Sequence, residues 1–244
     1  MCSSDLFKWG VGPYVEGLFT QSGLAIVTQM TIALAPRPER SVACLFSLPD
    51  DARLEEAVLR IQQLLAQLGA VGGGLNLMNR HRVLAMAAPY PRESLRGGPL
   101  IPADVIASLG RSHQIAPWTG FATLYGSRRL VAAARAEFRQ ALRGVAVRML
   151  FVTPQRARQL AHWTARLPGR WGHGIARTAS TLAQALDLVD GRPNETALPL
   201  AYWRGAAATS TPRDPARDGC GLLWYAPLVP MKPAEIRGYT ALVH

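Results

Sequence analysis

The chain has 244 residues, 49% of them apolar, and a formal net charge of +11. That length is enough for one large domain or two small ones with a hydrophobic core. The composition excludes a membrane-spanning helix, because Arg, Pro or Gly interrupts every apolar run before the roughly 18 to 20 residues that a span needs.

The positive charge comes almost entirely from arginine, since only Lys8 and Lys232 of the 27 basic residues are lysine. The arginines are dispersed along the sequence. Their one denser zone, over residues 156–177, is not the compact basic patch that is typical of proteins that bind the phosphates of nucleic acids. We therefore expect no nucleic acid and no membrane as a partner. The opening residues lack a secretory pattern, and the cellular location stays open.

Metal and redox motifs are not recognisable in this sequence. Cys2, Cys44 and Cys220 stand too far apart for a CxxC pair, and the five histidines form no HExxH motif. The glycine run at residues 72–74 lacks the flanking pattern of a phosphate-binding loop, so we expect a turn there. The carboxylates are scattered and offer no pair for acid–base chemistry. No metal site is assigned.

The first clear elements form a strand, a helix and then strands. Residues 42–48 are predicted to be a strand, a helix begins at residues 49–51 (Pro-Asp-Asp), and Gly69 ends it. Residues 75–87 are predicted to form one or two strands, 89–99 a loop and 102–109 a short helix. The apolar residues of the first helix recur at i, i+3, i+4 and i+7: Leu54, Ala57, Val58, Ile61, Leu64, Leu65 and Leu68.

The same order repeats further along the chain. Residues 118–125 and 145–152 read as strands on either side of a helix, whose apolar stripe is Val131, Ala134, Phe138 and Leu142. Helices that each bury one stripe against a sheet indicate an α+β fold with an antiparallel or mixed sheet, built from ferredoxin-like units.

The last third of the chain is predicted to hold two helices, a loop and a strand. The helices cover residues 154–167 and 178–189, the loop 206–219 and the strand 221–229. Pro233 is suited to the first turn of a final helix.

Two blocks resemble one enzyme family. They are residues 12–28 (GPYVEGLFTQSGLAIVT) and residues 217–231 (RDGCGLLWYAPLVPM), and both resemble the vanillyl-alcohol oxidase and p-cresol methylhydroxylase group. The shorter segments at 121–126 and 201–205 are also similar to this group. The resemblance implies that residues 7–38 end an FAD-binding domain and that 39–244 form a substrate-binding cap domain, incomplete at its C-terminus.

The resemblance also implies residues for the cofactor. A strand with Ile26, Val27 and Thr28 runs beside FAD in that group, preceded by Ser22 and Gly23. The group usually has glycine where this chain has Ala25, and the extra methyl narrows the approach of the backbone.

The roles of two aromatic residues each have two interpretations. Some members tether the flavin through a histidine that is missing from residues 221–225, and others use a tyrosine near the position of Tyr202. Tyr202 is therefore either a tether or a packing tyrosine. Trp224 matches an aromatic position at the substrate cavity, where a π face suits a flat phenol, and core packing is the other reading.

As a whole, the resemblance implies a fragment of an FAD-dependent oxidoreductase of 4-alkylphenols, inactive alone, whose catalytic residues lie outside the chain. It further implies a small phenolic substrate, a cytochrome or oxygen as electron acceptor, and a homo-oligomeric full-length enzyme. Residues 1–6 look like a non-native leader. The alternative is a complete, non-enzymatic α+β binding protein with a basic surface.

Overall fold

The computed structural model describes residues 23–29, 36–95, 97–98, 100–166, 180, 183–194, 203 and 229–243. The chain divides into two units, Met1–Arg37 and Pro38–His244. The four described strands all belong to the second unit.

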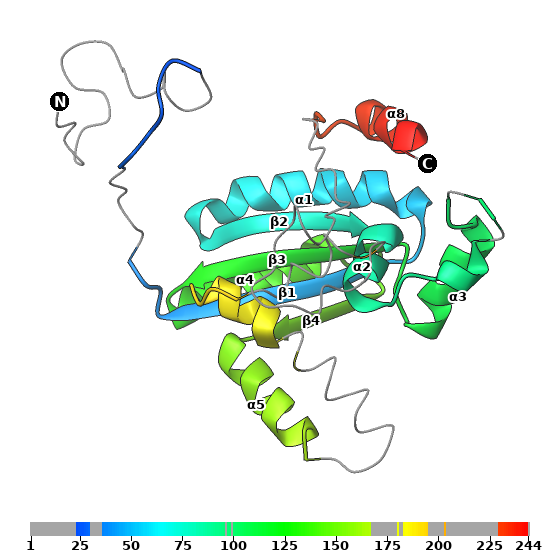
Figure 1. The fold of residues 1–244 in the computed structure, drawn as a ribbon. Helices are drawn as coiled ribbons and strands as arrows, with labels where there is room; N and C mark the ends of the chain where they lie inside the picture. Colours follow the sequence, from blue (N-terminus) through cyan, green and yellow to red (C-terminus); the bar gives the residue numbers. More distant parts are fainter. Residues whose placement is uncertain are drawn as a thin grey trace. The chain divides into compact units, whose positions relative to one another are not determined.

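A four-stranded antiparallel sheet organises the second unit (Figure 1). The strand order is β2-β3-β1-β4, so β1 and β3 lie in the centre and β2 and β4 at the edges. The strands are β1 (Arg40–Leu48), β2 (Gly72–Asn79), β3 (Trp118–Gly126) and β4 (Arg148–Val152). With one helix connecting β1 to β2 and another connecting β3 to β4, this is the ferredoxin-like arrangement. The predicted α+β class is confirmed.

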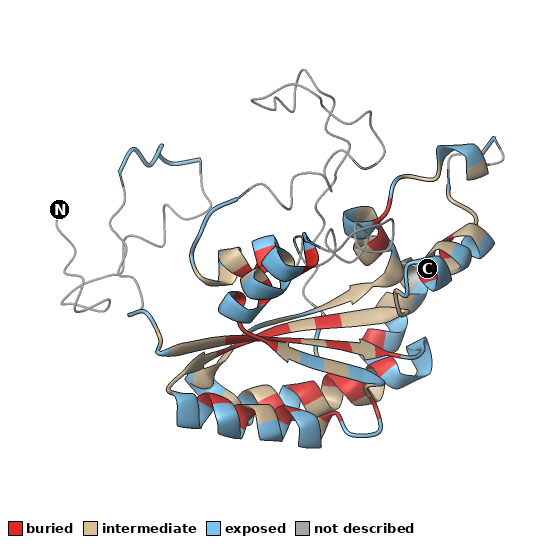
Figure 2. Cartoon of the chain, turned by 90° about the horizontal axis from the view of Figure 1, so that it is seen from below, coloured by how far each residue is buried: buried red, intermediate tan, exposed pale blue. Residues whose placement is uncertain are grey.

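Helices α1 (Leu54–Leu68) and α4 (Arg128–Ala141) cover one face of the sheet. Alternate residues of β1 point into this core, among them Cys44 and Phe46, and both predicted helix stripes are buried there or packed against it. Figure 2 shows the buried residues gathered in the sheet and on the helix faces that pack on it. The sequence periodicity predicted this core correctly.

The start and the end of α1 also match the prediction. A 3₁₀ turn (Asp51–Arg53) precedes the helix, and the Asp50 side chain caps that turn by accepting a hydrogen bond from the Arg53 N–H at 3.1 Å. Gly69 follows the last residue with a φ of 52°, a conformation that favours glycine, and begins a second 3₁₀ turn (Gly69–Val71).

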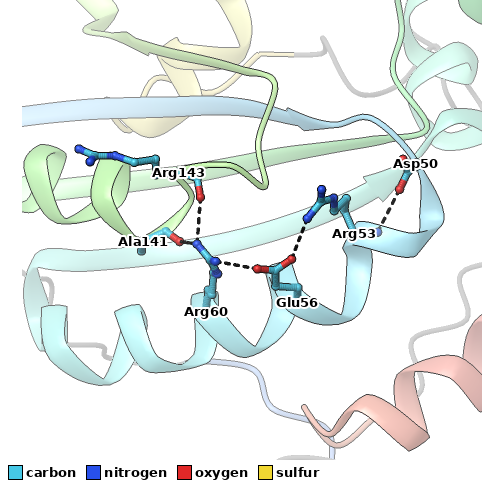
Figure 3. Close-up of polar contacts among 6 residues, drawn as sticks. All are labelled: Asp50, Arg53, Glu56, Arg60, Ala141 and Arg143. Atoms are coloured by element: carbon cyan, nitrogen blue, oxygen red, sulfur yellow. Dashed lines mark hydrogen bonds and ion pairs between the residues drawn. The ribbon is translucent and has the colours of Figure 1, made fainter.

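One arginine ties α1 to the end of α4 (Figure 3). Arg60 Nη1 donates to the carbonyl oxygens of Ala141, at 2.9 Å, and Arg143, at 3.0 Å. Its Nη2 donates to Glu56 at 2.6 Å, which holds the guanidinium in place. Arg60 thus satisfies carbonyls that α4 leaves unpaired at its C-terminus.

A smaller core lies on the opposite face of the sheet. Ala43 of β1 packs there with α5 (Pro154–Thr164) and with the helical residues 183–189. Arg158 joins these two helices through ion pairs to Asp187, at 2.5 Å, and Asp190, at 3.3 Å. The helix predicted over 154–167 is confirmed over Pro154–Thr164, and it ends there because residues 165 and 166 form a turn. The described residues 183–189 confirm the helix predicted over 178–189.

The prediction of strands over residues 75–87 is wrong in its second half. Residues 75–79 belong to β2, but Arg80–Ala87 form helix α2. The Asn79 side chain accepts a hydrogen bond from the Arg82 N–H at 3.0 Å, so a side-chain cap starts the helix. Leu84 is then fully buried against the next helix, α3 (Ala103–Ser112).

The turn expected at residues 72–74 is also wrong, because these glycines begin β2. A Cβ on Gly73 would lie 2.2 Å from Thr123 Oγ1 and 2.5 Å from the ring of Tyr125. The strand can pair with β3 only if this position carries no side chain, and the register shifts between Gly72 and Leu75.

The remaining predictions differ only at their boundaries. β4 begins at Arg148 and not at residue 145, since Val145 turns into the main core after α4. A 3₁₀ turn (Arg92–Ser94) lies in the predicted loop, and helix α8 (Pro233–Val243) begins at the predicted proline. The loop 206–219 and nearly all of the strand 221–229 lie outside the described residues. No helix of the described part is long and apolar enough to cross a membrane.

Candidate functional site

The structure describes only part of the predicted cofactor segment. Gly23, Ile26, Val27 and Thr28 lie in the first unit and are exposed, while Ser22 lies outside the described residues. Residues 25–29 have no regular secondary structure, so the strand implied by the resemblance is not formed. A strand needs a hydrogen-bonded neighbour, and none of the described strands pairs with this segment.

Tyr202 and Trp224 also lie outside the described residues. Their neighbour Trp203 is described: its indole N–H donates to the Ala88 carbonyl at 2.7 Å, and its ring meets Tyr90 edge to face at 5.1 Å. The predicted site residues are therefore not brought together within the described part of the chain.

A cavity of about 590 Å³ lies at one end of the sheet, where β2 ends, β3 begins and helices α2 and α3 both start. This volume falls in the range of about 300 to 1,000 Å³ that small-molecule sites occupy. Its walls combine apolar and aromatic side chains with a few polar ones: Asp51, Asn79, Arg80, His81, Tyr90, Leu100, Ile101, Ala103, Ile106, Pro117 and Trp118.

Arg80 is the most unusual residue of this cavity. Its Nε is buried and has no hydrogen-bond partner, and no ion pair joins its guanidinium to a described carboxylate. A buried unpaired donor costs about 1–3 kcal/mol. Gly110 of α3 makes room for this side chain, because a Cβ there would lie 2.6 Å from both Arg80 Cδ and Nε.

The opposite charge in the cavity is already engaged. Asp51 Oδ1 accepts a hydrogen bond from the indole N–H of Trp118 at 2.6 Å, which fixes the aromatic ring at the first residue of β3. Among the described residues, no group of three or more His, Cys, Asp or Glu could hold a metal ion. The lining is thus mainly aromatic and apolar, with one arginine and one carboxylate that form no ion pair with each other.

Sequence reasoning missed this cavity. Arg80 fell within a predicted strand, and Trp118 was interpreted only as the start of another. The missed signal was Asn79, an N-cap residue directly before Arg80, which would have indicated a helix start at the end of a strand.

Comparisons with known sequences find two informative relatives, while no protein-family model matches the chain. The chain is 36% identical over 230 residues to 1'-carboxy-chondrochloren decarboxylase of Chondromyces crocatus, covering 93% of the chain and 42% of that protein. It is 26% identical over 133 residues to the 4-cresol dehydrogenase [hydroxylating] flavoprotein subunit of Pseudomonas putida, covering 52% of the chain and 24% of that protein.

Two solved structures share the fold, each with a TM-score of 0.61 over 81% of this chain. One is p-cresol methylhydroxylase with substrate bound, at 20% identity and over 34% of its length. The predicted resemblance to p-cresol methylhydroxylase is confirmed. The other is 4-ethylphenol oxidase from Gulosibacter chungangensis in complex with isoeugenol, at 22% identity and over 35% of its length.

All four are named as enzymes or as a subunit of one, and one of them is named as a flavoprotein subunit. The chain spans less than half the length of the two curated relatives, 42% and 24%.

Proposed function

We propose that this chain is part of an FAD-dependent oxidoreductase that acts on 4-alkylphenols. The observation that carries the proposal is the fold shared with two enzymes named for p-cresol and 4-ethylphenol. The flavoprotein subunit among the sequence relatives supports the cofactor.

The proposal assigns two domains to the chain. Residues 7–38 end the FAD-binding domain, and 39–244 belong to the cap domain. The division of the chain after Arg37 supports the boundary between the domains.

The described part of the cofactor segment is compatible with a flat ring. Leu24, Ile26 and Val27 are 71%, 90% and 51% exposed, so their apolar surfaces are not used by the described part of the protein. Residues Ser22, Gly23, Ile26, Val27 and Thr28 would hold FAD. When bound, FAD supplies the capacity to accept a hydride.

The role of the protein in this reaction is to bind and orient the phenol. The substrate is held as a phenolate, hydride leaves its benzylic carbon, and the quinone methide that forms takes up water or loses a proton. The proposal places no catalytic residue in this chain. Trp224 lines the substrate cavity in this proposal, and Trp224→Ala in the full-length enzyme should raise the Michaelis constant; unchanged kinetics would leave it as a packing residue.

The proposal gives Tyr202 the role of a covalent tether for FAD. Mass spectrometry of the full-length protein should then find flavin attached to the peptide that contains Tyr202. A flavin that is released intact on denaturation would leave Tyr202 as a packing residue.

Oxidative decarboxylation is a second candidate, favoured by the 36% identity to 1'-carboxy-chondrochloren decarboxylase. In a phenol with a carboxylate on the carbon next to the benzylic one, hydride and the phenolic proton leave first. The bond to the carboxylate then breaks as CO₂, and its electron pair forms a side-chain double bond and restores the aromatic ring. The hydride would be accepted by bound FAD, so this half-reaction balances without another oxidant.

The first experiment is to recover the flanking DNA and express the extended reading frame. A yellow protein that is bleached by a 4-alkylphenol under anaerobic conditions supports the proposal, and CO₂ release from a carboxylated phenol would favour the second candidate. Reoxidation by oxygen or by a cytochrome identifies the acceptor, and light scattering tests the expected homo-oligomer. A reading frame that starts at residue 1, stops after residue 244 and gives a stable, flavin-free protein would favour the alternative of a binding protein with a basic surface.

A further inference from the structure

We propose that the cavity between the starts of α2 and α3 is a binding site for a small aromatic carboxylate. Its lining shares no residue with those assigned to FAD, and the site needs no flavin to form. Its chemistry follows from the charge, the aromatic walls and the ends of the two helices.

The charge of the cavity favours an anion. Arg80 lines the space, and no carboxylate of the described chain pairs with its guanidinium. A carboxylate can accept hydrogen bonds from a guanidinium, so a carboxylate ligand would supply the charged partner that the described residues do not.

The helix ends act in the same direction. Arg80 is the first residue of α2 and Ala103 the first of α3, and both line the cavity. A helix carries a partial positive charge at its N-terminus, and α3 has no side-chain cap there. Because Asn79 already caps the start of α2, the uncapped start of α3 and the Arg80 side chain are the two features that favour an anionic ligand.

The walls favour an aromatic body on that ligand. Trp118 and Tyr90 offer two rings, and Leu100, Ile101 and Ile106 contribute apolar surface. The hydrogen bond to Asp51 and the edge contact with Trp203 hold the two rings in place, so the site is largely preformed. The volume suits a molecule of one or two rings and not a folded partner.

Calorimetric titration of the full chain tests the proposal with 4-hydroxyphenylacetate and its neutral amide as probes. The acid should bind at least about tenfold more tightly than the amide, because only the acid forms a charged pair with Arg80. Equal affinities, or no binding of the acid, would overturn the proposal.

Variants locate the binding in this cavity. Arg80→Gln should lower the affinity for the acid by about tenfold or more and leave the affinity for the amide unchanged. Arg111→Gln removes the same charge outside the cavity lining and should change neither affinity. Should Arg80→Gln fail to fold, Gly110→Ala displaces the same guanidinium while keeping its charge, and it should also weaken the acid. Acid binding that survives both displacement and loss of Arg80 would place the ligand elsewhere.

Asp51→Asn provides a test with the opposite sign. Removing this carboxylate from the cavity wall should strengthen acid binding by about twofold, as expected for a partly exposed charge. A weaker affinity would contradict an anion site. Because the titration needs no flavin, a failure to bind the acid would not contradict the proposed oxidase. Conversely, a colourless full-length protein would contradict the oxidase and not this binding site.

Discussion

Two regions of the second unit are built for different purposes. Where α1 and α4 cover the sheet, large side chains are buried. The Arg135 Nε is buried there without a hydrogen-bond partner, but its guanidinium carbon lies 5.0 Å from the centroid of the Phe151 ring. At the starts of α2 and α3 the apolar cluster is small, and a cavity with an unpaired Arg80 remains open. Close packing gives stability, whereas open space and an unsatisfied donor are features of binding sites.

The strongest test of this contrast removes one large side chain from each region. Phe138 is 1% exposed, so Phe138→Ala should cost about 3–5 kcal/mol of unfolding free energy, measured by urea denaturation. Ile101 is half-buried and lines the cavity, so its side chain already faces open space. Ile101→Ala should therefore lower the unfolding free energy by about 1 kcal/mol or less. Equal losses would remove the distinction between the two regions.

A glycine in the packed region should tolerate no side chain. Gly120 lies opposite Phe46 in the register, and a Cβ on it would come within 2.1 Å of the Phe46 ring. Gly120→Ala should therefore destabilise the protein by about 1–3 kcal/mol. In the background of Phe46→Leu the same change should cost less, and a double-mutant cycle without coupling would contradict the contact.

The packed region should also respond to alkaline pH. Burial raises the pKa of Cys44 to about 12, while the charges of Arg139 and Arg135 act in the opposite direction. The unfolded thiol ionises near pH 9, so above that pH the unfolded state binds fewer protons and stability falls until about pH 12. We expect a loss of about 2 kcal/mol by pH 10.5.

The control for this pH effect is Cys44→Ala, which should show a smaller loss of stability over the same range. A thiol-alkylating reagent should modify Cys44 in the folded protein far more slowly than in urea. Rapid alkylation at pH 8 without denaturant would show that the core is more open than the structure indicates.

The smallest expected effects concern two polar contacts of the packed region. Arg60→Gln removes the bonds that join α1 to the last carbonyls of α4 and should cost about 1–2 kcal/mol in thermal unfolding. Arg53→Gln removes an exposed ion pair with the same Glu56 and should cost less than about 0.5 kcal/mol. The reverse order would mean that the helix-end carbonyls are satisfied by water at no cost.

The correct predictions and the errors follow from how far apart the interacting residues lie. The stripes of α1 and α4 were read correctly, because burial of one helix face leaves a period in the sequence itself. The glycines at 72–74 were read as a turn, because the side chains that exclude a Cβ there, Thr123 and Tyr125, lie about fifty residues away on another strand.

Local pattern thus determined the α+β class, the helix stripes, the glycine stop of α1 and the resemblance to a phenol-oxidising family. Only the tertiary structure decided the cavity and the state of Arg80. A guanidinium is paired or unpaired according to which distant carboxylates reach it, and it finds room beside α3 only because residue 110 has no side chain. Neither condition leaves a periodic trace along the chain, so neither could be read from the sequence.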